Sequence, residues 1–543
     1  MKNILEGLKG SFGGVLVAFL LSFMLAFYEP LNMYTGNVDD FWFSLSDFLP
    51  IIVMQFGIMF TVIALFYIIV YFINKKAYRF FLVVGFIMTL ATYIQGNFLA
   101  YNLPGLAGNQ IDWSEYRVDQ AISIVLWAVV IVGSLFALKK LKFEKFEKAI
   151  KWISAAIIVM IFVATVSLLI KPNVLDEKST EVTKFDNFNT ISKDKNFIIF
   201  LVDQVDSRVF NNELSKNWDK REIFRDFTYY PDTSSTYLWT IFSVPYILTG
   251  EWWENDRPQF GDYFTSAIDN SLLFNELEKE NYKMNLYEDE ELLNYKGENL
   301  GRFDNIRSDA RIRKKELVKQ EIQYVLFRYL PYQLKPVAKI ENLDINRTKE
   351  SSDGELYSSL NDVVYDYIRE DLNVVDDKYF AFIHVVGAHP PFVYDKELVR
   401  HTEEGTYEDG VNASISIVNE YLKRLRKNGM YDNSVIIIMS DHGNGEKDTT
   451  IERSNPILYI KGINEKHDYE KSSKKISYAN LNDAYIQLLK GDTSDKLFEN
   501  LDNSKRRLIY SELYNPELTE MIQTGNAWDT ETLVKTGNKY LRE

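Results

Sequence analysis

The stretch Val435-Ile-Ile-Ile-Met439-Ser-Asp-His-Gly443 joins an apolar run directly to an acid, an imidazole and a glycine. The apolar run has the length and the β-branched composition of a buried strand. Asp441 and His442 would then stand side by side at the carboxyl end of that strand, where oxygen and nitrogen ligands suit a divalent metal such as zinc or manganese. The same residues are also typical of an ordinary loop after a strand. The metal interpretation therefore depends on further ligands elsewhere in the chain.

Other short apolar runs share this character and alternate with helical patterns. The runs lie at Asn196–Val202, Tyr379–Val386, Ile457–Ile460 and Leu508–Tyr510, and the predicted strand of the opening stretch spans Ser434–Met439. The helical patterns lie at Leu272–Glu280, Lys315–Tyr329, Leu356–Leu372 and Val411–Lys427. Continuous apolar strands are typical of a sheet that is covered by helices on both faces. We therefore predict an α/β domain with a mixed, mainly parallel sheet between helices and with ligands at the carboxyl ends of the strands.

Further polar residues lie in or directly after these predicted strands. Asp203 follows the first strand, where a carboxylate is equally typical of a helix N-cap. His384 lies inside a strand, as a satisfied core histidine would. His389 follows Gly387 and precedes two prolines, so its imidazole is expected to be exposed on a rigid loop. Together with Asp441 and His442, these side chains are the candidate ligands and acid–base groups.

A hydroxyl-rich segment supplies a candidate nucleophile. It runs Asp232-Thr-Ser-Ser-Thr-Tyr-Leu-Trp-Thr-Ile-Phe-Ser-Val-Pro245 and opens a predicted helix. A hydroxyl at a helix N-terminus lies beside unpaired backbone N–H groups, which favour a phosphoryl group. Metal coordination would lower the pKa of such a hydroxyl and activate it. The alternative is an ordinary helix with a Ser/Thr cap.

Long apolar runs precede Lys171, and each is of a length that can cross a bilayer. They are Phe12–Tyr28, Leu49–Ile73, Phe80–Ile94 continuing toward Tyr101, Ala121–Leu138 and Trp152–Ile170. One such run could be a buried core helix, and the first could be a signal peptide, but no small-residue cleavage pattern follows it. Five runs in succession predict a transmembrane domain of five helices.

The charges of the short loops predict the orientation of these spans. Lys and Arg gather at the N-terminus, in the turn 75–79 and in the gap 139–151, whereas the alternate loops are acidic or neutral. Basic loops remain in the cytoplasm. We therefore expect a multi-pass protein of the cell membrane with a cytoplasmic N-terminus. After five spans, everything beyond Lys171 would lie on the extracytoplasmic side.

Length and composition fit this division. The chain has 543 residues, a formal net charge of −15 and no cysteine. The acidic balance argues against a nucleic-acid partner, and the lack of cysteine excludes disulfides, thiolate ligands and a cysteine nucleophile. We predict a transmembrane domain over residues 1–171, a polar linker over 172–195 and an extracytoplasmic catalytic domain over 196–543.

Taken together, the motifs resemble the alkaline-phosphatase/sulfatase superfamily. Within it, they resemble the membrane-anchored lipoteichoic acid synthases and lipid A phosphoethanolamine transferases. The resemblance covers the whole chain, because those families also place five spans before an extracytoplasmic catalytic domain. Asp203 matches their acidic residue after the first strand, although the transferases more often have Glu. Thr240, three residues before Ser243-Val244-Pro245, matches their nucleophile. The segment from His384 to His389 matches their His-x-x-Gly-x-His motif.

The resemblance implies a set of roles. One divalent ion, Mn²⁺ or Zn²⁺, would be held by Asp203, Thr240, Asp441 and His442. Thr240 would be the nucleophile, and His389 would bind the substrate phosphate or act as an acid or base. His384 and Arg208 are further candidates for substrate binding. The expected fold is a sulfatase-like α/β domain that follows an all-α transmembrane domain.

Departures from the pattern narrow the function. Sulfatases need a Cys or Ser in a Cys/Ser-x-Pro-x-Arg context. This chain has no Cys, and none of its Ser residues stands in that context. Phosphoethanolamine transferases usually carry another His soon after Asp-His-Gly, whereas here the next is His467. Those enzymes also tend to use disulfides, which this chain cannot form. The sequence therefore favours transfer of phosphoglycerol from phosphatidylglycerol, as the phospholipid donor, onto a surface glycan or polymer.

Other functions stay open at the level of sequence. A phosphoethanolamine transferase, or a phosphodiesterase of the same fold with water as the acceptor, would use the same metal and nucleophile. An inactive membrane scaffold or sensor is the alternative from another class. That alternative predicts a missing ligand, whereas the ligand set here is complete.

Overall fold

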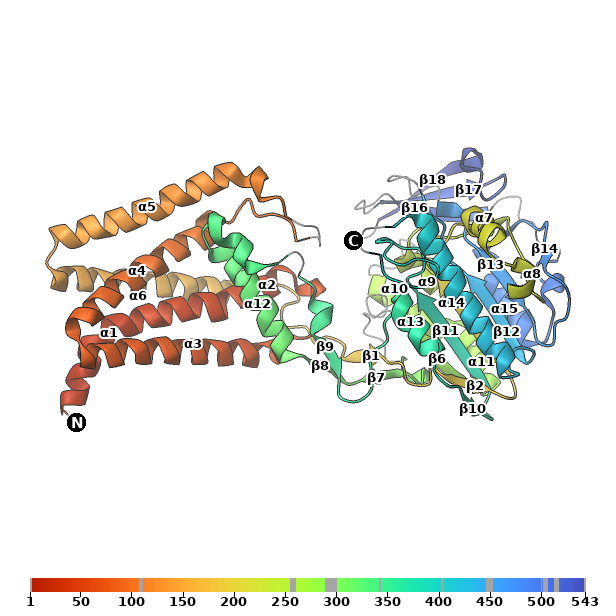
Figure 1. Cartoon of the computed structure of the whole chain (residues 1–543), viewed down its shortest axis with the longest axis horizontal. Helices are drawn as coiled ribbons and strands as arrows, with labels where there is room; N and C mark the ends of the chain where they lie inside the picture. Colours follow the sequence, from red (N-terminus) through yellow and green to blue (C-terminus); the bar gives the residue numbers. More distant parts are fainter. Residues whose placement is uncertain are drawn as a thin grey trace. The chain divides into compact units, whose positions relative to one another are not determined.

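The computed structural model describes residues 2–106, 111–253, 260–288, 300–340, 343–401, 405–445, 453–499, 501, 506–511 and 517–541. Contacts divide the chain into two compact units (Figure 1). The first unit comprises Met1–Thr180 together with Arg311–Glu350. The second comprises Glu181–Ala310 and Ser351–Glu543. The predicted linker 172–195 is therefore shared between the units.

The first unit contains five helical segments that are long and apolar enough to cross a membrane, counted over the described residues. They span Lys9–Gly36, Leu45–Ile73, Lys75–Phe98, Trp113–Lys140 and Phe143–Leu169. The prediction of five apolar helices is confirmed. The first segment extends past the predicted end at Tyr28, because a π-helical turn, Met24–Tyr28, connects α1 (Lys2–Phe23) to α2 (Glu29–Gly36). Pro30 is the second residue of α2, directly after the π-helical turn.

The second and third helical segments begin before the predicted starts of their apolar runs, because polar residues cap their N-termini. Ser44 and Asp47 form a reciprocal capping box, so α3 (Leu45–Ile73) begins before the apolar run at Leu49. The side chain of Asn74 accepts hydrogen bonds from two N–H groups at the start of α4 (Lys75–Phe98). Polar caps thus lengthen both helices beyond their apolar parts. The remaining long helices are α5 (Arg117–Lys140) and α6 (Phe143–Leu169).

Helix α12 (Lys314–Tyr329) matches the predicted helix, but it packs in the first unit. Its position in the sequence predicts a place in the catalytic domain over 196–543. Its last residue, Tyr329, packs so closely on Gly96 of α4 that a Cβ at position 96 would lie 2.3 Å from the tyrosine ring. The Tyr329 hydroxyl also donates to Glu29 Oε2 at 2.9 Å. Residues 311–350 are therefore an insertion from the catalytic half of the sequence into the membrane unit.

The second unit is built on a seven-stranded sheet with the order β14-β4-β13-β12-β3-β11-β6. The strands are β14 (Glu470–Lys471), β4 (Thr228–Tyr229), β13 (Leu458–Lys461), β12 (Ser434–Met439), β3 (Asn196–Val202), β11 (Tyr379–Val385) and β6 (Lys283–Tyr287). Strands β12, β3, β11 and β6 run parallel, whereas β13 is antiparallel to both of its neighbours. The prediction of a mixed, mainly parallel sheet is confirmed.

Helices cover both faces of this sheet. Alternate residues of β3 divide between two hydrophobic clusters, with Phe197 and Leu201 in one and Ile198 and Phe200 in the other. Helices α9 (Thr240–Thr249), α11 (Leu272–Lys279) and α15 (Leu481–Leu489) supply the first cluster. Helices α7 (Ser207–Asn217), α13 (Asn361–Ile368) and α14 (Tyr407–Lys427) supply the second. Each fully buried side chain of this kind contributes about 1.5–3 kcal/mol, so the sheet is a rigid support for its strand ends.

Two predicted elements differ from the structure in their pairing. The run at Leu508–Tyr510 belongs to β16 (Arg506–Ser511), in a separate antiparallel sheet with β17 (Glu517–Gln523) and β18 (Leu533–Leu541). The predicted linker contains β1 (Glu181–Thr183) and β2 (Thr190–Ser192). These short strands pair with β7 (Ile306–Ser308) and β10 (Asn373–Val375). Their few residues carry too little periodicity to reveal a strand.

Candidate metal centre and nucleophile

The parallel strands β3 and β12 place two carboxylates at one edge of the sheet. In their register Met439 lies opposite Leu201, so Asp441 lies opposite Asp203 two residues further on. Asp203, Asp441 and His442 are 7%, 0% and 1% exposed, so all three side chains point into the interior. Their ligand atoms lie within 4.8 Å of one another. The strand ends thus bring together side chains that are far apart in the sequence.

Helix α9 adds Thr240 to this cluster. Its Oγ1 lies 3.4 Å from Asp203 Oδ1 and 3.4 Å from His442 Nε2. Thr240 is the first residue of the helix, and the N-cap residue Trp239 contributes no side-chain cap. Ser243 fixes the helix to the strand end, because its hydroxyl donates to the Asp441 carbonyl oxygen at 2.7 Å. All four residues predicted as metal ligands therefore meet at one point.

The protonation of His442 leaves one ring nitrogen free for a ligand role. Its Nδ1 lies 2.7 Å from the Gly443 carbonyl oxygen, an acceptor, so this nitrogen carries the proton. Burial lowers the pKa of His442, which keeps the ring neutral. The Nε2 lone pair then faces Asp441 Oδ2 at 3.2 Å. A neutral imidazole whose second nitrogen is held by a carbonyl is the usual form of a metal-ligating histidine.

The two carboxylates fit a divalent cation. Burial raises the pKa of Asp203 well above its usual range, and the neighbouring Asp441 carboxylate raises it further. Two such groups cannot both be ionised unless a positive charge lies between them. In the described part of the chain, Asp441 Oδ2 accepts no hydrogen bond. A metal ion would remove the repulsion between the two carboxylates and would give Asp441 Oδ2 a partner. The donor set of two carboxylates, one imidazole and one hydroxyl therefore fits Mn²⁺ or Zn²⁺.

Glu288 was missed by the sequence analysis and lies directly behind the site. His384 Nδ1 is 2.7 Å from Glu288 Oε1, and His384 Nε2 is 4.0 Å from Asp203 Oδ2. Burial alone would lower the pKa of His384, but the Glu288 and Asp203 carboxylates outweigh it and raise the pKa to about 10. The imidazolium therefore bridges two acids. Glu288 follows β6, whose sequence Lys-Met-Asn-Leu-Tyr is too mixed to indicate a buried strand, so no local signal marks this residue.

Gly387 allows the His384–His389 segment to approach β3. Its φ is +62°, and a Cβ at this position would lie 2.7 Å from the backbone N and O atoms of Asp203. The Ala388 N–H donates to the Asp203 carbonyl oxygen at 3.0 Å. Only glycine fits this contact, so the glycine of the motif positions the acidic residue at the strand end.

Arg453 is a second residue that the sequence analysis missed. Its guanidinium lies 4.6 Å from the centre of the Trp239 ring, next to Thr240 in the sequence. Burial lowers the pKa of Arg453, whereas the Asp441 and Asp203 carboxylates act in the opposite direction. Among the described residues it forms no ion pair, and its backbone oxygen accepts from the Gly443 N–H at 2.8 Å. No local pattern marks Arg453, because only the fold brings it to this place.

Residues 195–481 match the Sulfatase protein family, which is more than half of the chain. The chain belongs to the sulfatase family. Members of this family use a metal, in keeping with the cluster of Asp203, Asp441 and His442. No curated protein matches the chain at a significant level.

Solved structures similar to this sulfatase-family chain include Ps i-CgsB in complex with k-i-k-neocarrahexaose. It is 14% identical, the match covers 61% of this chain and 82% of that chain, and the TM-score is 0.40. An alkaline phosphatase superfamily protein from Vibrio parahaemolyticus is 10% identical, with coverages of 67% and 84% and a TM-score of 0.35. The C-terminal periplasmic domain of EcEptC from Escherichia coli, in complex with Zn, is 11% identical, with coverages of 66% and 95% and a TM-score of 0.33.

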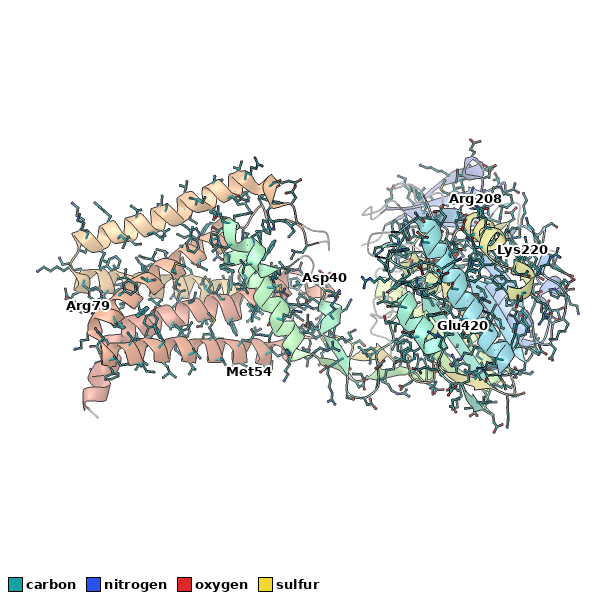
Figure 2. All side chains as sticks on the ribbon, in the orientation of Figure 1. Asp40, Met54, Arg79, Arg208, Lys220 and Glu420 are labelled. Carbon is teal, nitrogen blue, oxygen red and sulfur yellow. The ribbon has the colours of Figure 1, made fainter. Side chains whose placement is uncertain are left out.

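Two predicted substrate residues of the sulfatase-family domain lie outside the cluster of four ligands, but His389 is close enough to add to the effect of burial in lowering the pKa of His442. His389 is exposed on the loop after β11, and its Nδ1 lies 2.8 Å from the Pro390 carbonyl oxygen. Arg208 on α7 (Figure 2) is 58% exposed and lies 3.5 Å from Asp206, the N-cap of that helix. Within the described residues, neither side chain is joined to the four predicted ligands by a hydrogen bond or an ion pair. Their roles in substrate binding stay predictions.

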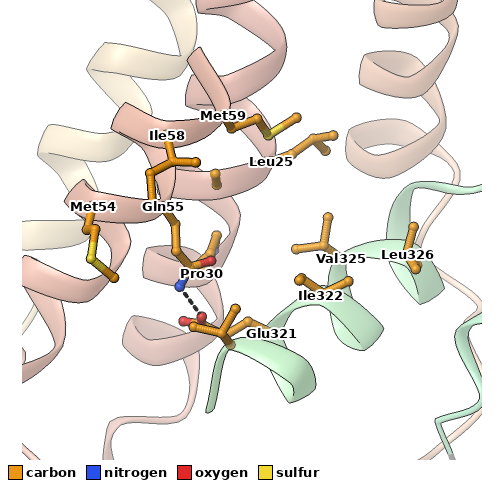
Figure 3. A pocket seen from close by; sticks show the side chains of 12 residues that line it. Leu25, Pro30, Met54, Gln55, Ile58, Met59, Glu321, Ile322, Val325 and Leu326 are labelled. Carbon is orange, nitrogen blue, oxygen red and sulfur yellow. Dashed lines mark hydrogen bonds between the residues drawn. The ribbon is translucent and has the colours of Figure 1, made fainter. Parts of the chain in front are cut away.

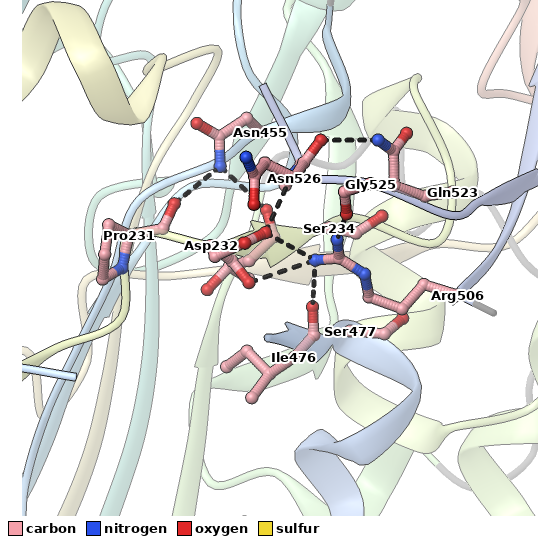
Figure 4. A network of polar contacts seen from close by, with 12 residues as sticks. Pro231, Asp232, Ser234, Asn455, Ile476, Ser477, Arg506, Gln523, Gly525 and Asn526 are labelled. Carbon is pink, nitrogen blue, oxygen red and sulfur yellow. Dashed lines mark hydrogen bonds and ion pairs between the residues drawn. The ribbon is translucent and has the colours of Figure 1, made fainter. Parts of the chain in front are cut away.

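A buried polar network supports the segment that leads to Thr240 (Figure 4). Arg506 Nη1 of β16 lies 2.8 Å from Asp232 Oδ1 and also donates to the Ile476 carbonyl oxygen at 3.2 Å. The Ala527 N–H donates to the same Asp232 oxygen at 2.8 Å. This network joins the C-terminal sheet to the hydroxyl-rich segment of the sulfatase-family domain. The carboxylate that the sequence places at the start of that segment is therefore structural.

Proposed function

We propose that the chain transfers a phospholipid headgroup through a phosphothreonine intermediate at Thr240. The headgroup is phosphoglycerol from phosphatidylglycerol, and the acceptor is a hydroxyl of a cell-surface glycan or polymer. The observation that carries the proposal is the position of Thr240, at the start of α9 and 3.4 Å from both Asp203 and His442. With no cysteine in the chain, a threonine is the nucleophile that this centre offers.

The residues of the cluster support this chemistry. Asp203, Thr240, Asp441 and His442 would hold one divalent ion, Mn²⁺ or Zn²⁺, which lowers the pKa of the Thr240 hydroxyl and polarises the phosphoryl group when bound. Thr240 Oγ1 attacks phosphorus as its proton leaves to solvent, and a new O–P bond forms. The bond between phosphorus and the diacylglycerol oxygen breaks, and that oxygen takes up a proton. An acceptor hydroxyl then attacks the phosphothreonine and loses its proton. The bond between phosphorus and Thr240 Oγ1 breaks, and Oγ1 takes up a proton, which regenerates Thr240.

Arg453 and His389 complete the proposed site. The guanidinium of Arg453 has no carboxylate partner in the described part of the chain and lies over the Trp239 ring, 4.6 Å from its centre. A planar guanidinium binds the non-bridging oxygens of a phosphoryl group well. His389, exposed on its loop, contacts the phosphate or protonates the leaving oxygen. The proposed orientation places this domain on the extracytoplasmic side, where acceptor glycans lie.

The test is mass spectrometry of full-length protein after incubation with membranes that contain phosphatidylglycerol. The wild-type protein should carry a phosphoglycerol adduct on Thr240, and the mass identifies the headgroup. Thr240→Ala should lose the adduct and lower transfer by at least about a thousandfold, while its unfolding temperature is retained. Thr240→Ser, which keeps a hydroxyl, is the matched control. Full activity of Thr240→Ala would overturn the proposal.

Labelled phosphatidylglycerol separates transfer from hydrolysis. Transfer predicts label on the glycan or polymer fraction. Free glycerol phosphate without glycan label would assign a phosphodiesterase instead. An adduct with the mass of phosphoethanolamine would change the donor and leave the nucleophile in place.

A further inference from the structure

A pocket of about 430 Å³ lies within the membrane unit, between the first helical segment, α3 and α12 (Figure 3). Its lining is Leu25, Ala26, Pro30, Met54, Gln55, Ile58, Met59, Val318, Glu321, Ile322, Val325 and Leu326. The volume falls in the usual range of ligand pockets. Met54, Ile58 and Ile322 are 49%, 60% and 51% exposed, so the pocket opens on an apolar surface. On helices that cross a bilayer, such a surface meets lipid.

The pocket contains one polar pair in an otherwise apolar wall. Gln55 donates a hydrogen bond from Nε2 to Glu321 Oε2 (Figure 3). Glu321 is 1% exposed, and its second oxygen, Oε1, has no hydrogen-bond partner in the described part of the chain. A buried polar atom without a partner destabilises the fold, and the bilayer core holds no water that could satisfy it. A ligand with a hydrogen-bond donor would therefore pair with Glu321 Oε1.

The wall that carries Glu321 is firmly held. Two turns further along α12, Arg328 Nη1 lies 3.1 Å from Glu29 Oε1, and Arg328 Nε donates to the Gly96 carbonyl oxygen at 3.2 Å. Tyr329 packs on Gly96 and donates to Glu29. These contacts join α12 to α2 and α4. The pocket is thus a built feature of the membrane unit, formed by a helix inserted from the catalytic half of the sequence.

We propose that this pocket binds diacylglycerol, with acyl chain against the apolar wall and the free glycerol hydroxyl at Glu321 Oε1. The proposal rests on the proposed function, in which diacylglycerol is the lipid that leaves when phosphoglycerol is transferred. The site would receive the leaving lipid within the membrane unit. A hydroxyl can donate to a carboxylate and accept from a carboxylic acid, so it pairs with either form of Glu321.

The charge of the lining favours a neutral lipid over the intact phospholipid. The described residues that line the pocket include Glu321 and no Lys or Arg. A phosphodiester would suffer like-charge repulsion beside an ionised Glu321. Burial raises the pKa of Glu321 to about 7, and beside the protonated form the phosphodiester would still be buried without a cation. Loss of the phosphoryl group removes that repulsion and leaves one hydroxyl in its place. The pocket therefore discriminates by charge between the lipid before and after transfer.

The experiment uses full-length Thr240→Ala protein in phosphatidylcholine vesicles with a diacylglycerol that carries a diazirine in one acyl chain. Because this variant cannot form the adduct, binding is measured without transfer. Light should attach the probe to peptides that contain Met54–Met59 and Val318–Leu326, identified by mass spectrometry. Unlabelled diacylglycerol should compete at least about tenfold better than phosphatidylglycerol. Equal or better competition by phosphatidylglycerol would overturn the proposal.

Two variants test the two halves of the pocket. Val325→Trp fills the apolar part. Val129→Trp is its matched control, because Val129 of α5 is 63% exposed and lies outside the pocket lining. Glu321→Met removes the acceptor at similar volume and should weaken labelling roughly fivefold, the factor for one lost hydrogen bond. Glu321→Gln keeps polar atoms that a hydroxyl can pair with and should weaken it less. Labelling that survives both Val325→Trp and Glu321→Met would overturn the site.

The two proposals can fail separately. If Thr240 never carries an adduct but the probe labels the pocket as expected, the headgroup transfer is wrong and the neutral-lipid site stands. If the adduct forms but phosphatidylglycerol competes equally, the transfer stands and the diacylglycerol site is wrong.

Discussion

In the membrane unit the carboxylate of Glu29 is fully buried and is met by Arg328 at 3.1 Å and by the Tyr329 hydroxyl at 2.9 Å. In the catalytic unit Asp203 and Asp441 are buried side by side, and the imidazolium of His384 lies 4.0 Å from Asp203. His384 is itself shared with a third carboxylate, Glu288. The first arrangement is balanced in charge, and the second has an excess of negative charge.

This difference separates two uses of buried charge. A paired charge joins two elements of the fold, as Arg328 joins α12 to α2, and its removal leaves an uncompensated partner. Carboxylates that face each other weaken the fold unless a cation binds, and such strain is typical of functional sites. The charges that surround a buried carboxylate therefore distinguish a structural ion pair, such as that of Glu29 with Arg328, from a candidate metal site, such as that of Asp203 and Asp441.

Asp441→Asn should have the largest effect on the catalytic side of the comparison. The proposed transfer should fall at least about a thousandfold, because a proposed metal ligand is lost. The metal-free protein should unfold at a higher temperature, because the repulsion between Asp441 and Asp203 is gone. Activity assays, bound-metal analysis and calorimetry check both results. Asp206→Asn, which keeps the cap of α7, is the control and should stay active.

Glu29→Gln should have the opposite signature in the membrane unit. It leaves Arg328 buried without its ion-pair partner, which costs about 3–5 kcal/mol, and α12 should become open to trypsin in detergent. The double variant Glu29→Gln/Arg328→Met should recover part of the loss. Glu144→Gln breaks an exposed pair with Arg79 and is the control, with little change expected. Equal stability of Glu29→Gln and the wild type would contradict a structural role for the ion pair between Glu29 and Arg328.

Arg453→Lys tests a cation that belongs neither to the ion pairs nor to the carboxylate cluster. Its guanidinium lies over Trp239 and has no ion-pair partner among the described residues. Lysine keeps the charge but loses the planar fork and the stacking. We expect KM for phosphatidylglycerol to rise roughly tenfold or more, with little change in unfolding temperature. Arg426→Lys is matched, since Arg426 stacks on Tyr431 at 4.3 Å and donates to the Ile223 carbonyl oxygen. It should leave KM unchanged.

His467 gives the smallest expected effect and a check on pH. Burial alone would lower its pKa, but hydrogen bonds with the Asp468 carbonyl and the Glu465 carboxylate outweigh it and raise the pKa above 6.5. The resulting stabilisation is fully present below pH 6.5 and is lost as the pH rises through the raised folded-state pKa. Its size is about 0.5 kcal/mol. Unfolding free energies of wild type and His467→Gln should differ at pH 5.5 and converge at pH 9.

Some elements of the fold could be predicted because their signal is local. The strand at Asn196–Val202 and the strand at Ser434–Met439 were predicted with the observed bounds, because each is an unbroken apolar run. The predicted helix Leu356–Leu372 is shorter in the structure, where α13 spans Asn361–Ile368. Its ends depend on packing against α14, which no local pattern records. The prediction of four converging ligands follows the same logic, since each stands at a strand or helix end.

The sequence by itself determined the five apolar helices, the buried strands, and the acid, hydroxyl and imidazole side chains at their ends. Hydropathy and residue type are properties of short segments, so they can be read without a fold. Only the tertiary structure decided that α12 leaves the catalytic half of the chain for the membrane unit. It also decided that Glu288 faces His384 and that Arg453 lies on Trp239 beside Thr240. These contacts join residues distant in sequence, and their energies depend on burial and charge partners that exist only once the chain has folded.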